Sequence, residues 1–496
     1  MQFNSVQFMF FFPAVCAVYF VIPKKLRVLW LLVCSYVFYM AWNVRYAALM
    51  ATSTLATYLS GLALEPKGLP ADGREEAGPR TSRRAQRPRR TILAACIIFN
   101  LAILAVFKYG NMFLATIRST RTLDLLLPVG ISFYTFQALG YIIDVYRGDM
   151  KPERNILRSA LFVSFFPQLV AGPIERSRSL LTQVQRAHET KLWNADRVTR
   201  GAILMVWGFF LKMVLSDRAA ILVDAVWEDY HAFGRVSLLL ATLAFTLQIY
   251  CDFGGYSMIA IGAAKILGFD LMENFNTPYL ATSIRDFWSR WHISLSTWFR
   301  DYLYIPLGGN RKGEGRRRLN LLITFLVSGL WHGADWSFVL WGGIHGAGQL
   351  VEDLLFRNKK KIRGDESGMP APRKSSRFVT FVRWGVTFAF VNFAWIFFRA
   401  PDIASALDFL KCFVHNSGVN DLVLPVEERW ILFFAILVLL AFDRVRKKFG
   451  QTPDTYLTNR RLSTEWGILI FLIVCIFVFG EYGPTFDPKA FIYFQF

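Results

Sequence analysis

The chain has 496 residues, of which 54% are hydrophobic, and a formal net charge of +20. The hydrophobic share, together with repeated long apolar runs, excludes an ordinary soluble protein and indicates a polytopic membrane protein. The charge does not predict nucleic-acid binding, because the basic residues gather in short loops between the apolar runs, as in the positive-inside pattern.

Apolar runs recur along the chain and predict roughly ten to twelve membrane segments, some of them tilted, re-entrant or buried in a helical bundle. The first run lacks a preceding basic region and a small-residue cleavage site, so we expect a retained helix rather than a signal peptide. The sequence thus predicts an all-α, polytopic membrane protein with one integral domain, residues 1–496. The main runs are residues 8–22, 28–42, 91–107, 202–215, 236–250, 384–398, 430–442 and 466–479.

Short basic loops between the runs set the expected orientation. Lys and Arg are retained on the cytoplasmic side of membrane proteins, so these loops are predicted to be cytoplasmic. Two longer stretches, 65–90 and 358–376, are rich in charged residues, Gly and Pro, and are predicted to be flexible cytoplasmic loops. The basic loops are residues 24–27, 80–90, 311–318, 357–377 and 444–448.

Residues 128–350 form the predicted functional core. Here apolar residues mix with Gly, Pro, aromatic and charged residues, as in FPQLVAGP at 166–173 and DFGGYS at 252–257. Irregular backbone at membrane depth is tolerated only where protein or a water-filled cavity surrounds it. This composition therefore predicts cavity-lining or re-entrant segments.

Residues 283–301 combine aromatic and charged side chains. Ser283 and Asp286 fit a capping box, which predicts that a helix begins here. An interfacial amphipathic helix with an aromatic belt is the structural alternative to a functional cavity wall. Continued helical spacing would place four side chains on one face: Arg285, Trp288, Ser289 and His292.

His332 lies in a segment that is hydrophobic enough to belong to a membrane helix. The thirteen residues 319–331, most of them apolar, separate it from the basic cluster before them, and a straight helix of that length rises about 20 Å. Gly333 and Asp335 then interrupt the run. An ionisable residue at this depth is a functional candidate by default, which predicts a buried, cavity-lining histidine at a helix break. The alternative is a histidine that only hydrogen-bonds across helices.

Several chemistries are excluded by their missing motifs. Residues 308–313 do not form a P-loop, and neither an H-E-x-x-H zinc site nor a G-x-S-x-G nucleophile elbow occurs. The six cysteines form no C-x-x-C pair, and no metal ligand set is predicted. What remains is one or two embedded histidines, which suit general-base activation of a hydroxyl group.

A resemblance adds to these patterns. FWSRWHISLSTWFRDYLYIPLGGN at 287–310 and GLWHG at 329–333 closely resemble the membrane-bound O-acyltransferase family. The IPLGGN element is similar to the bacterial alginate O-acetylation branch of that family. Further similar segments are LPVGISFYTFQ at 127–137, PQLVAGP at 167–173 and FAWIFFRA at 393–400.

The resemblance implies a helical bundle with a funnel through a thinned centre. It places the family's catalytic histidine on His332 and the supporting histidine on His292. Where relatives often have an acidic residue after Tyr-Ser, this chain has Met258, which leaves the role of that acidic residue in doubt.

The resemblance also implies a reaction and its participants. Acetyl-CoA would be the donor substrate, with no permanently bound cofactor, and an extracytoplasmic polysaccharide would be the acceptor. A separate extracytoplasmic hydrolase-like partner and the bacterial cell membrane as location are implied as well. Arg311, Lys312 and Arg316 are candidates for binding the CoA phosphates, although ordinary positive-inside topology also explains them.

Two rival functions stay open at this point. One is D-alanyl transfer to teichoic acid from a carrier-protein thioester, against which the GGN element at 308–310 weighs. The other is a transporter or polysaccharide export component with His332 in its path. A transporter would need no acetyl-CoA and would give no acyl product.

Overall fold

A computed structural model of the chain describes residues 1–65, 83–117, 123, 125–170, 172–191, 193–361, 376–420 and 423–481, with the side chains of 83–87 and 356–361 excepted. The regular secondary structure of the described residues is helical, apart from two isolated bridges at Phe233 and Gly234, which agrees with the predicted all-α class. Contacts divide the chain into two compact units, residues 1–201 with 263–272, and residues 202–262 with 273–496. The prediction of one integral domain stays a prediction.

Five continuous helical stretches of the described chain are long and apolar enough to cross a membrane. This agrees with a multi-pass membrane protein, while the finer expectation of roughly ten to twelve segments around a central funnel stays a prediction. The stretches are Pro88–Thr116, Ala195–Glu228, Arg235–Leu267, Arg377–Arg399 and Leu462–Phe479.

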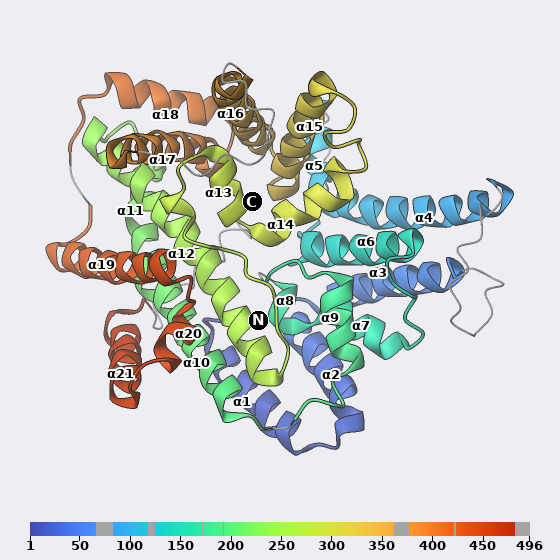
Figure 1. Ribbon diagram of the computed structural model, residues 1–496. Helices are drawn as coiled ribbons and strands as arrows, with labels where there is room; N and C mark the ends of the chain where they lie inside the picture. The colour runs from blue at the N-terminus through green and yellow to red at the C-terminus, as the bar shows by residue number, and fades with distance from the viewer. Residues whose placement is uncertain are drawn as a thin grey trace. The chain divides into compact units, whose positions relative to one another are not determined.

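In the first unit, α3, α4 and α6 lie side by side (Figure 1). Within it, α2 packs on α7, and α3 and α4 pack on α6. Phenylalanine rings from α1, α2 and α8 form its core, with Phe11 and Phe38 each within 6 Å of Phe166, at 5.4 and 5.6 Å between ring centroids. The helices are α1 (Val6–Val21), α2 (Arg27–Met40), α3 (Val44–Ala63), α4 (Arg83–Leu104), α5 (Gly110–Thr116), α6 (Ile131–Arg147), α7 (Ile156–Ser164), α8 (Phe166–Leu169) and α9 (Ser177–Gln185).

Two sequence expectations fall in this unit. The predicted irregular segment at 166–173 contains the short buried helix α8, whose first N–H, that of Phe166, donates to the Ser35 hydroxyl at 3.1 Å. Of the predicted loop at 65–90, residues 66–82 lie outside the described residues, whereas residues 83–90 form the first turns of α4. The Arg, Gln and Ala residues there have good helix propensity, so the helix begins earlier than the composition suggested.

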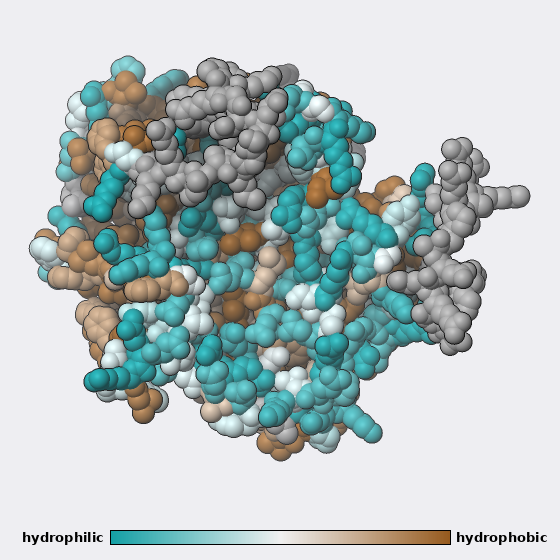
Figure 2. Space-filling view, viewed as in Figure 1, coloured by the Kyte–Doolittle hydropathy of each residue, from teal (hydrophilic) through white to brown (hydrophobic). Residues whose placement is uncertain are grey.

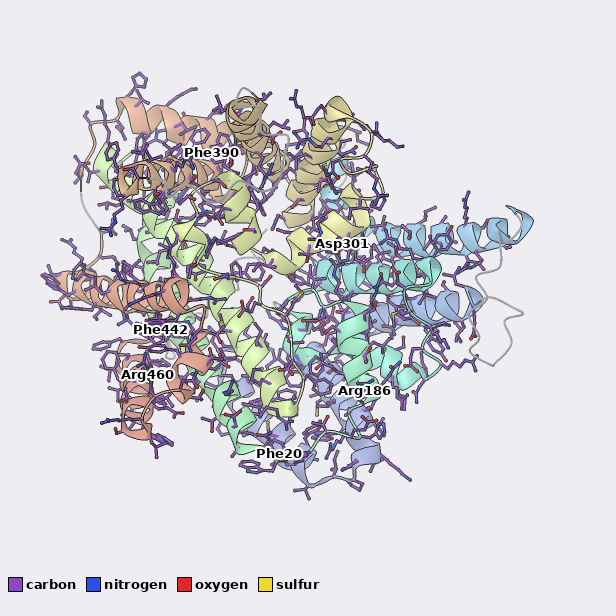
Figure 3. All side chains as sticks on the ribbon, viewed as in Figure 1. Phe20, Arg186, Asp301, Phe390, Phe442 and Arg460 are labelled. Atoms are coloured by element: carbon purple, nitrogen blue, oxygen red, sulfur yellow. The ribbon has the colours of Figure 1, made fainter. Side chains whose placement is uncertain are left out.

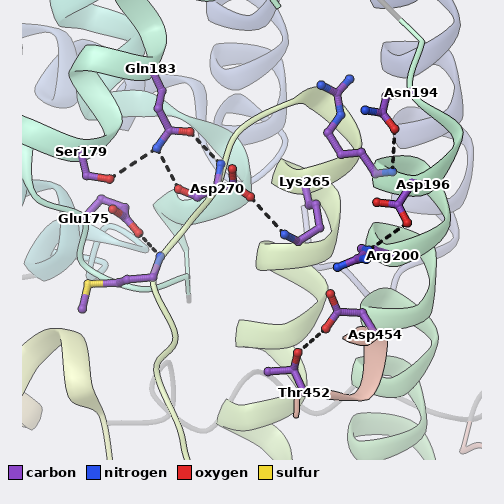
Figure 4. A network of polar contacts seen from close by, with 12 residues as sticks. Glu175, Ser179, Gln183, Asn194, Asp196, Arg200, Lys265, Asp270, Thr452 and Asp454 are labelled. Carbon is purple, nitrogen blue, oxygen red and sulfur yellow. Dashed lines mark hydrogen bonds and ion pairs between the residues drawn. The ribbon is translucent and has the colours of Figure 1, made fainter. Parts of the chain in front are cut away.

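Helix α9 holds the segment that follows α12 (Figure 4). The Gln183 carboxamide oxygen accepts from the Asp270 N–H at 2.7 Å, and its NH2 group donates to the Asp270 carbonyl at 2.9 Å. The buried Glu175 carboxylate accepts from the Met272 N–H at 2.5 Å. Burial raises the pKa of Glu175 to about 7, because the contacts that favour its charged form do not offset the desolvation.

The second unit contains the segments in which the candidate histidines lie. Two π-helical segments interrupt its helices, η3 (Phe210–Ser216) and η5 (Arg300–Tyr304). The predicted loop at 358–376 lies mostly outside the described residues, and its first residues extend α16. The helices are α10 (Ala195–Phe209) and α12 (Arg235–Leu267), which both units share, and α11 (Asp217–Glu228), α13 (Ile284–Arg290), α14 (Ile293–Phe299), α15 (Glu314–His332), α16 (Trp336–Lys361), α17 (Arg377–Arg399), α18 (Ile403–His415), α19 (Val426–Phe449), α20 (Pro453–Thr458) and α21 (Leu462–Phe479).

The outer side of α19 is strongly apolar (Figure 2). Trp430 and Phe434 are 58% and 59% exposed, and Leu440 is 50% exposed. A contiguous apolar surface of this kind suits contact with lipid. The fold therefore keeps large apolar side chains on its outside while polar groups lie within it.

Candidate active site

A helical hairpin carries His332. Helix α15 ends at His332, Gly333 is extended with φ −150° and ψ 159°, and α16 begins at Trp336. The Asp335 carboxylate accepts from the Ser337 N–H at 2.7 Å and so caps α16. The helix break predicted from Gly333 and Asp335 is thus confirmed.

Two glycines let the hairpin close tightly (Figure 1). A Cβ atom at Gly329 would lie 2.2 Å from the Phe338 carbonyl oxygen, and one at Gly342 would lie 2.2 Å from that of Phe325. No real side chain tolerates such distances, so α15 and α16 approach each other through backbone contacts. Small residues serve this purpose in membrane helix pairs. The close contact fixes the position of His332, one turn beyond Gly329.

The His332 side chain is enclosed by aromatic rings. It is 2% exposed, and the Trp331 and Trp341 ring centroids each lie 5.0 Å from that of its imidazole. Phe398 from α17 lies 5.6 Å away. The predicted burial is confirmed, whereas the lining of the two cavities described below does not include His332.

His292 lies at a sharp turn. Helix α13 ends at Arg290, and His292 has the left-handed values φ 43° and ψ 53° before α14 begins at Ile293. The predicted single face containing Trp288 and His292 is therefore wrong. The turn is held by backbone bonds to the preceding segment, Ile293 N–H to the Asn274 carbonyl at 2.9 Å and Asn276 N–H to the Arg290 carbonyl at 2.9 Å.

Asn274 also orients the His292 ring. Its side-chain oxygen lies 3.1 Å from His292 Nδ1 and accepts from the Ser294 hydroxyl at 2.8 Å. Its NH2 group donates to the Ser257 hydroxyl at 3.2 Å. Because an amide oxygen only accepts, Nδ1 must carry the proton, which leaves the lone pair on Nε2. Sequence reasoning missed Asn274, since nothing in its spacing marks it as a partner of His292.

The two predicted histidines come together in space. Their ring centroids are 6.1 Å apart, and both rings contact Trp331. They approach from α15 and from the α13–α14 turn, both within the second unit. The predicted helix start at Ser283 is also confirmed, because the Ser283 side chain accepts from the Asp286 N–H at 3.0 Å. The Asp286 carboxylate in turn accepts from the Thr282 N–H at 3.1 Å.

A third buried histidine, His345, was not predicted. It is fully buried on α16, and its Nδ1 accepts from the Trp288 indole N–H at 3.2 Å. Its ring centroid lies 5.1 Å from that of Trp341, which also contacts His332. Trp288 therefore faces His345 rather than sharing a helix face with His292. The available signal was the same as for His332, an ionisable residue within an apolar run.

One cavity lies along α15, toward the basic N-terminal end of that helix. It has a volume of about 510 Å³ and reaches Ser328, one turn before His332. Its cationic residues are Arg285, Arg300 and Arg317. Arg300 pairs at 2.8 Å with Asp301, which is labelled in Figure 3, and Arg317 pairs with Asp353.

A second cavity, of about 720 Å³, adjoins the other end of α15. Its lining includes Ala334 and Asp335, two and three residues after His332, together with Asp224, Glu228 and Arg399. The first cavity reaches α15 before His332 and the second reaches the chain after it. The histidine therefore occupies the buried interval between them.

The three candidate phosphate ligands, Arg311, Lys312 and Arg316, lie around the turn that leads into α15 and are exposed. The basic residues lining the first cavity are others, although Asn310 and Arg317 place this turn at its mouth. Phosphate binding by the three residues stays a prediction.

Comparison with known proteins identifies relatives of this arrangement. The profile of the membrane-bound O-acyltransferase family matches residues 154–388. The chain is 38% identical to the probable alginate O-acetylase AlgI of Pseudomonas putida over the full length of both proteins. It is 33% identical to the peptidoglycan O-acetyltransferase of Helicobacter pylori over 84% of this chain and 80% of that protein. A teichoic acid D-alanyltransferase of Bacillus subtilis is 29% identical over 54% of this chain and 68% of its own length.

Proposed function

The chain belongs to the membrane-bound O-acyltransferase family, and we propose that it transfers an acetyl group from acetyl-CoA, for O-acetylation of an extracytoplasmic polysaccharide. The observation that carries this proposal is the buried His332 between two cavities, one approaching α15 before it and the other after it. A residue in this position can meet a donor from one side and an acceptor from the other.

The proposed reaction is a direct acyl transfer. His332 takes the proton of the acceptor hydroxyl, whose oxygen attacks the thioester carbonyl of acetyl-CoA. The carbon–sulfur bond then breaks, and the CoA thiolate leaves and receives the proton from the imidazolium. An aromatic, water-poor surrounding supports this step, because it keeps the resting imidazole neutral and limits hydrolysis of the thioester.

His292 is proposed as the supporting histidine. Its ring lies beside that of His332, and Asn274 holds its Nδ1–H so that Nε2 carries the lone pair. In this tautomer it can accept a hydrogen bond at the reacting centre and help to place the acceptor.

The donor is proposed to enter through the first cavity. Arg311, Lys312 and Arg316 at the nearby turn provide positive charge for the phosphates of CoA. The three arginines in the cavity wall are each paired with a carboxylate and could exchange it for a phosphate. This assigns the turn to the cytoplasmic side of the bacterial cell membrane, in agreement with the positive-inside pattern. The second cavity would then receive the acceptor, either the polysaccharide or a hydroxyl group of an extracytoplasmic hydrolase-like partner.

The rival functions receive less support. The D-alanyltransferase match covers about half of this chain, whereas the relatives named for O-acetylation match over most or all of it. Family membership favours an enzyme over a transporter.

The test is transfer from labelled acetyl-CoA in membranes that contain wild type or His332→Ala at matched expression. His188→Ala is the control, because His188 has a side chain that is 54% exposed in the other unit. We expect label on a glycan or protein acceptor with wild type and His188→Ala only. Equal labelling by His332→Ala would refute its role as the base. Labelling only from a D-alanyl carrier thioester would support the rival enzyme.

A further inference from the structure

Three side chains that could bind a metal ion lie close together. His231 is in the connection 229–234 between α11 and α12, and Asp408 and Cys412 are on α18. The His231 Nε2 atom lies 3.1 Å from an Asp408 carboxylate oxygen, and the Cys412 sulfur lies 3.3 Å from His231 Nδ1. One ligand atom from each residue lies within 4.8 Å of the other two. Within the described residues, this is the one group of three or more His, Cys, Asp or Glu residues that meets this condition.

We infer that His231, Asp408 and Cys412 form a zinc-binding site. One imidazole, one carboxylate and one thiolate are the ligand types that zinc prefers, and three protein ligands leave a fourth position for water or another oxygen donor. In a tetrahedral zinc site, bonds of about 2.0–2.3 Å separate neighbouring donors by roughly 3.3–3.5 Å. The observed sulfur–nitrogen distance already has this length.

The change in side-chain geometry that zinc binding requires is small. His231 and Asp408 have side chains that are 62% and 41% exposed, so both can rotate without disturbing a packed core. A rotation that brings the carboxylate toward the same ring nitrogen as the sulfur would complete the site, because a single metal ion binds only one nitrogen of an imidazole.

The backbone that carries the donors is held firmly. The Asn416 side chain donates to the carbonyls of His231 at 2.7 Å and Phe233 at 2.6 Å. Backbone bonds join Gly234 N–H to the Val419 carbonyl at 2.9 Å and Val419 N–H to the Ala232 carbonyl at 3.2 Å. The connection that bears His231 is thus tied to the segment after α18, which keeps the donors within reach of one another.

Residues next to the three donors make contacts with them and between their helices, as is usual around metal ligands. The Tyr230 hydroxyl donates to Asp408 Oδ2 at 3.2 Å, and metal-binding carboxylates usually accept a hydrogen bond of this kind. Close to these residues in the chain, the Trp227 and Phe409 rings stack with 4.5 Å between their centroids and 6° between their planes, and this contact joins α11 to α18. A bound zinc ion would reinforce this junction.

The site also adjoins the second cavity. Tyr230 and Ser405, which lie beside His231 and one turn before Asp408, belong to the lining that includes Asp335. Zinc bound here would brace the rim of the cavity that we assign to the acceptor. This inference rests on the donor geometry alone and does not require acetyl transfer.

Zinc content of the purified full-length protein in lipid nanodiscs tests the inference. After incubation with zinc sulfate and extensive dialysis, we expect one zinc ion per wild-type chain. In titration, His231→Asn and Cys412→Ser should bind zinc more than about 100-fold more weakly, because even the loss of a residue that only hydrogen-bonds to a ligand weakens metal sites by about 10–100-fold. Cys16→Ser is the matched control, since Cys16 is also partly exposed but lies on α1, and it should keep the ion.

A second measurement covers variants that do not fold. In the wild-type protein, zinc should slow maleimide labelling of Cys412 and leave that of Cys16 unchanged. Zinc content equal in wild type and Cys412→Ser, or an unchanged labelling rate of Cys412, would overturn the inference. Neither result bears on His332, so its failure and that of the proposed function are distinguishable.

Discussion

Two regions of the second unit bury titratable side chains, and the surroundings of those side chains differ. Around His332 and His292, two titratable rings lie among aromatic side chains. Trp331, Trp341 and Phe398 contact His332, and Trp331 and Phe253 contact His292. In and near η3, the fully buried Lys212 ammonium lies 2.8 Å from a carboxylate oxygen of Asp217 and 2.8 Å from one of Asp252. The first region surrounds its titratable rings with aromatic rings, whereas the second pairs an ammonium group with two carboxylates.

The difference separates structural from chemical roles. A buried charge that is paired at close distance is costly to break but has no free capacity for a reaction. A neutral histidine in an aromatic surrounding can accept a proton without first losing an ion pair. Both regions satisfy the rule that an ionisable residue in a membrane protein is functional by default. Around His332 the chain lines one cavity at Ser328 and a second one at Ala334 and Asp335.

The largest expected effect is on catalysis, from His332→Ala. Loss of a general base should lower the rate of acetyl transfer by about 10²–10⁴-fold. The unfolding midpoint should fall by much less than for a broken ion pair, because the side chain contributes no buried charge. Initial rates with labelled acetyl-CoA and thermal unfolding of the same preparations measure both quantities. If His332→Ala lowered the unfolding midpoint strongly but kept the acetyl-transfer rate of wild type, His332 would have a structural role and not a catalytic one.

The next largest effect is on stability, from Lys212→Met. Removing the ammonium leaves two buried carboxylates without it, which should cost about 3–5 kcal/mol of unfolding free energy. Met preserves the apolar stem, so lost packing is not the cause. The triple change Lys212→Met, Asp217→Asn and Asp252→Asn should recover much of the stability. Thermal and denaturant unfolding test this, and equal loss in single and triple variants would contradict the pairing argument.

Asn274→Ala should slow acetyl transfer by about 10–100-fold, because a small misplacement of a catalytic group has effects of this size. The His292 ring would lose the acceptor that fixes its tautomer. Asn274→Asp keeps an acceptor there and should retain more activity, while its negative charge raises the pKa of His292 and moves the pH–rate profile to higher pH. Identical profiles for both variants and wild type would mean that Asn274 has only a structural role.

The smallest effect concerns Glu175 in the first unit, a buried carboxyl without a close ammonium partner of the Lys212 kind. Its pKa of about 7 lies above the unfolded value, so its protonated form stabilises the fold. This contribution is complete below about pH 4.5 and is lost as the pH rises through 7. Wild type should therefore lose on the order of 1–2 kcal/mol relative to Glu175→Gln between pH 5 and 7. Unfolding at both pH values tests this, and parallel curves would refute it.

Local patterns in the chain were sufficient for several features. The capping box at Ser283 and the break after His332 depend on residues within a few positions of one another, so spacing predicted both. The family motifs around His292 and His332 likewise marked the two histidines that the fold brings to 6.1 Å. Chain-wide hydrophobicity predicted a multi-pass helical protein, which the five long apolar helices support.

Tertiary contacts decided what local spacing could not. Helical periodicity placed Trp288 beside His292, but backbone bonds to Asn274 turn the chain at His292 and direct Trp288 to His345. The donors His231 and Cys412 are far apart in the sequence and meet because Asn416 and backbone bonds to Val419 tie their segments together. Composition and local spacing therefore determined that this chain forms membrane helices with an embedded histidine at a break, since those properties arise from hydrophobicity and short-range hydrogen bonds. The neighbours of each buried polar group were decided by the tertiary structure, because a hydrogen bond between distant segments depends on how they pack and leaves no periodic signal in either one.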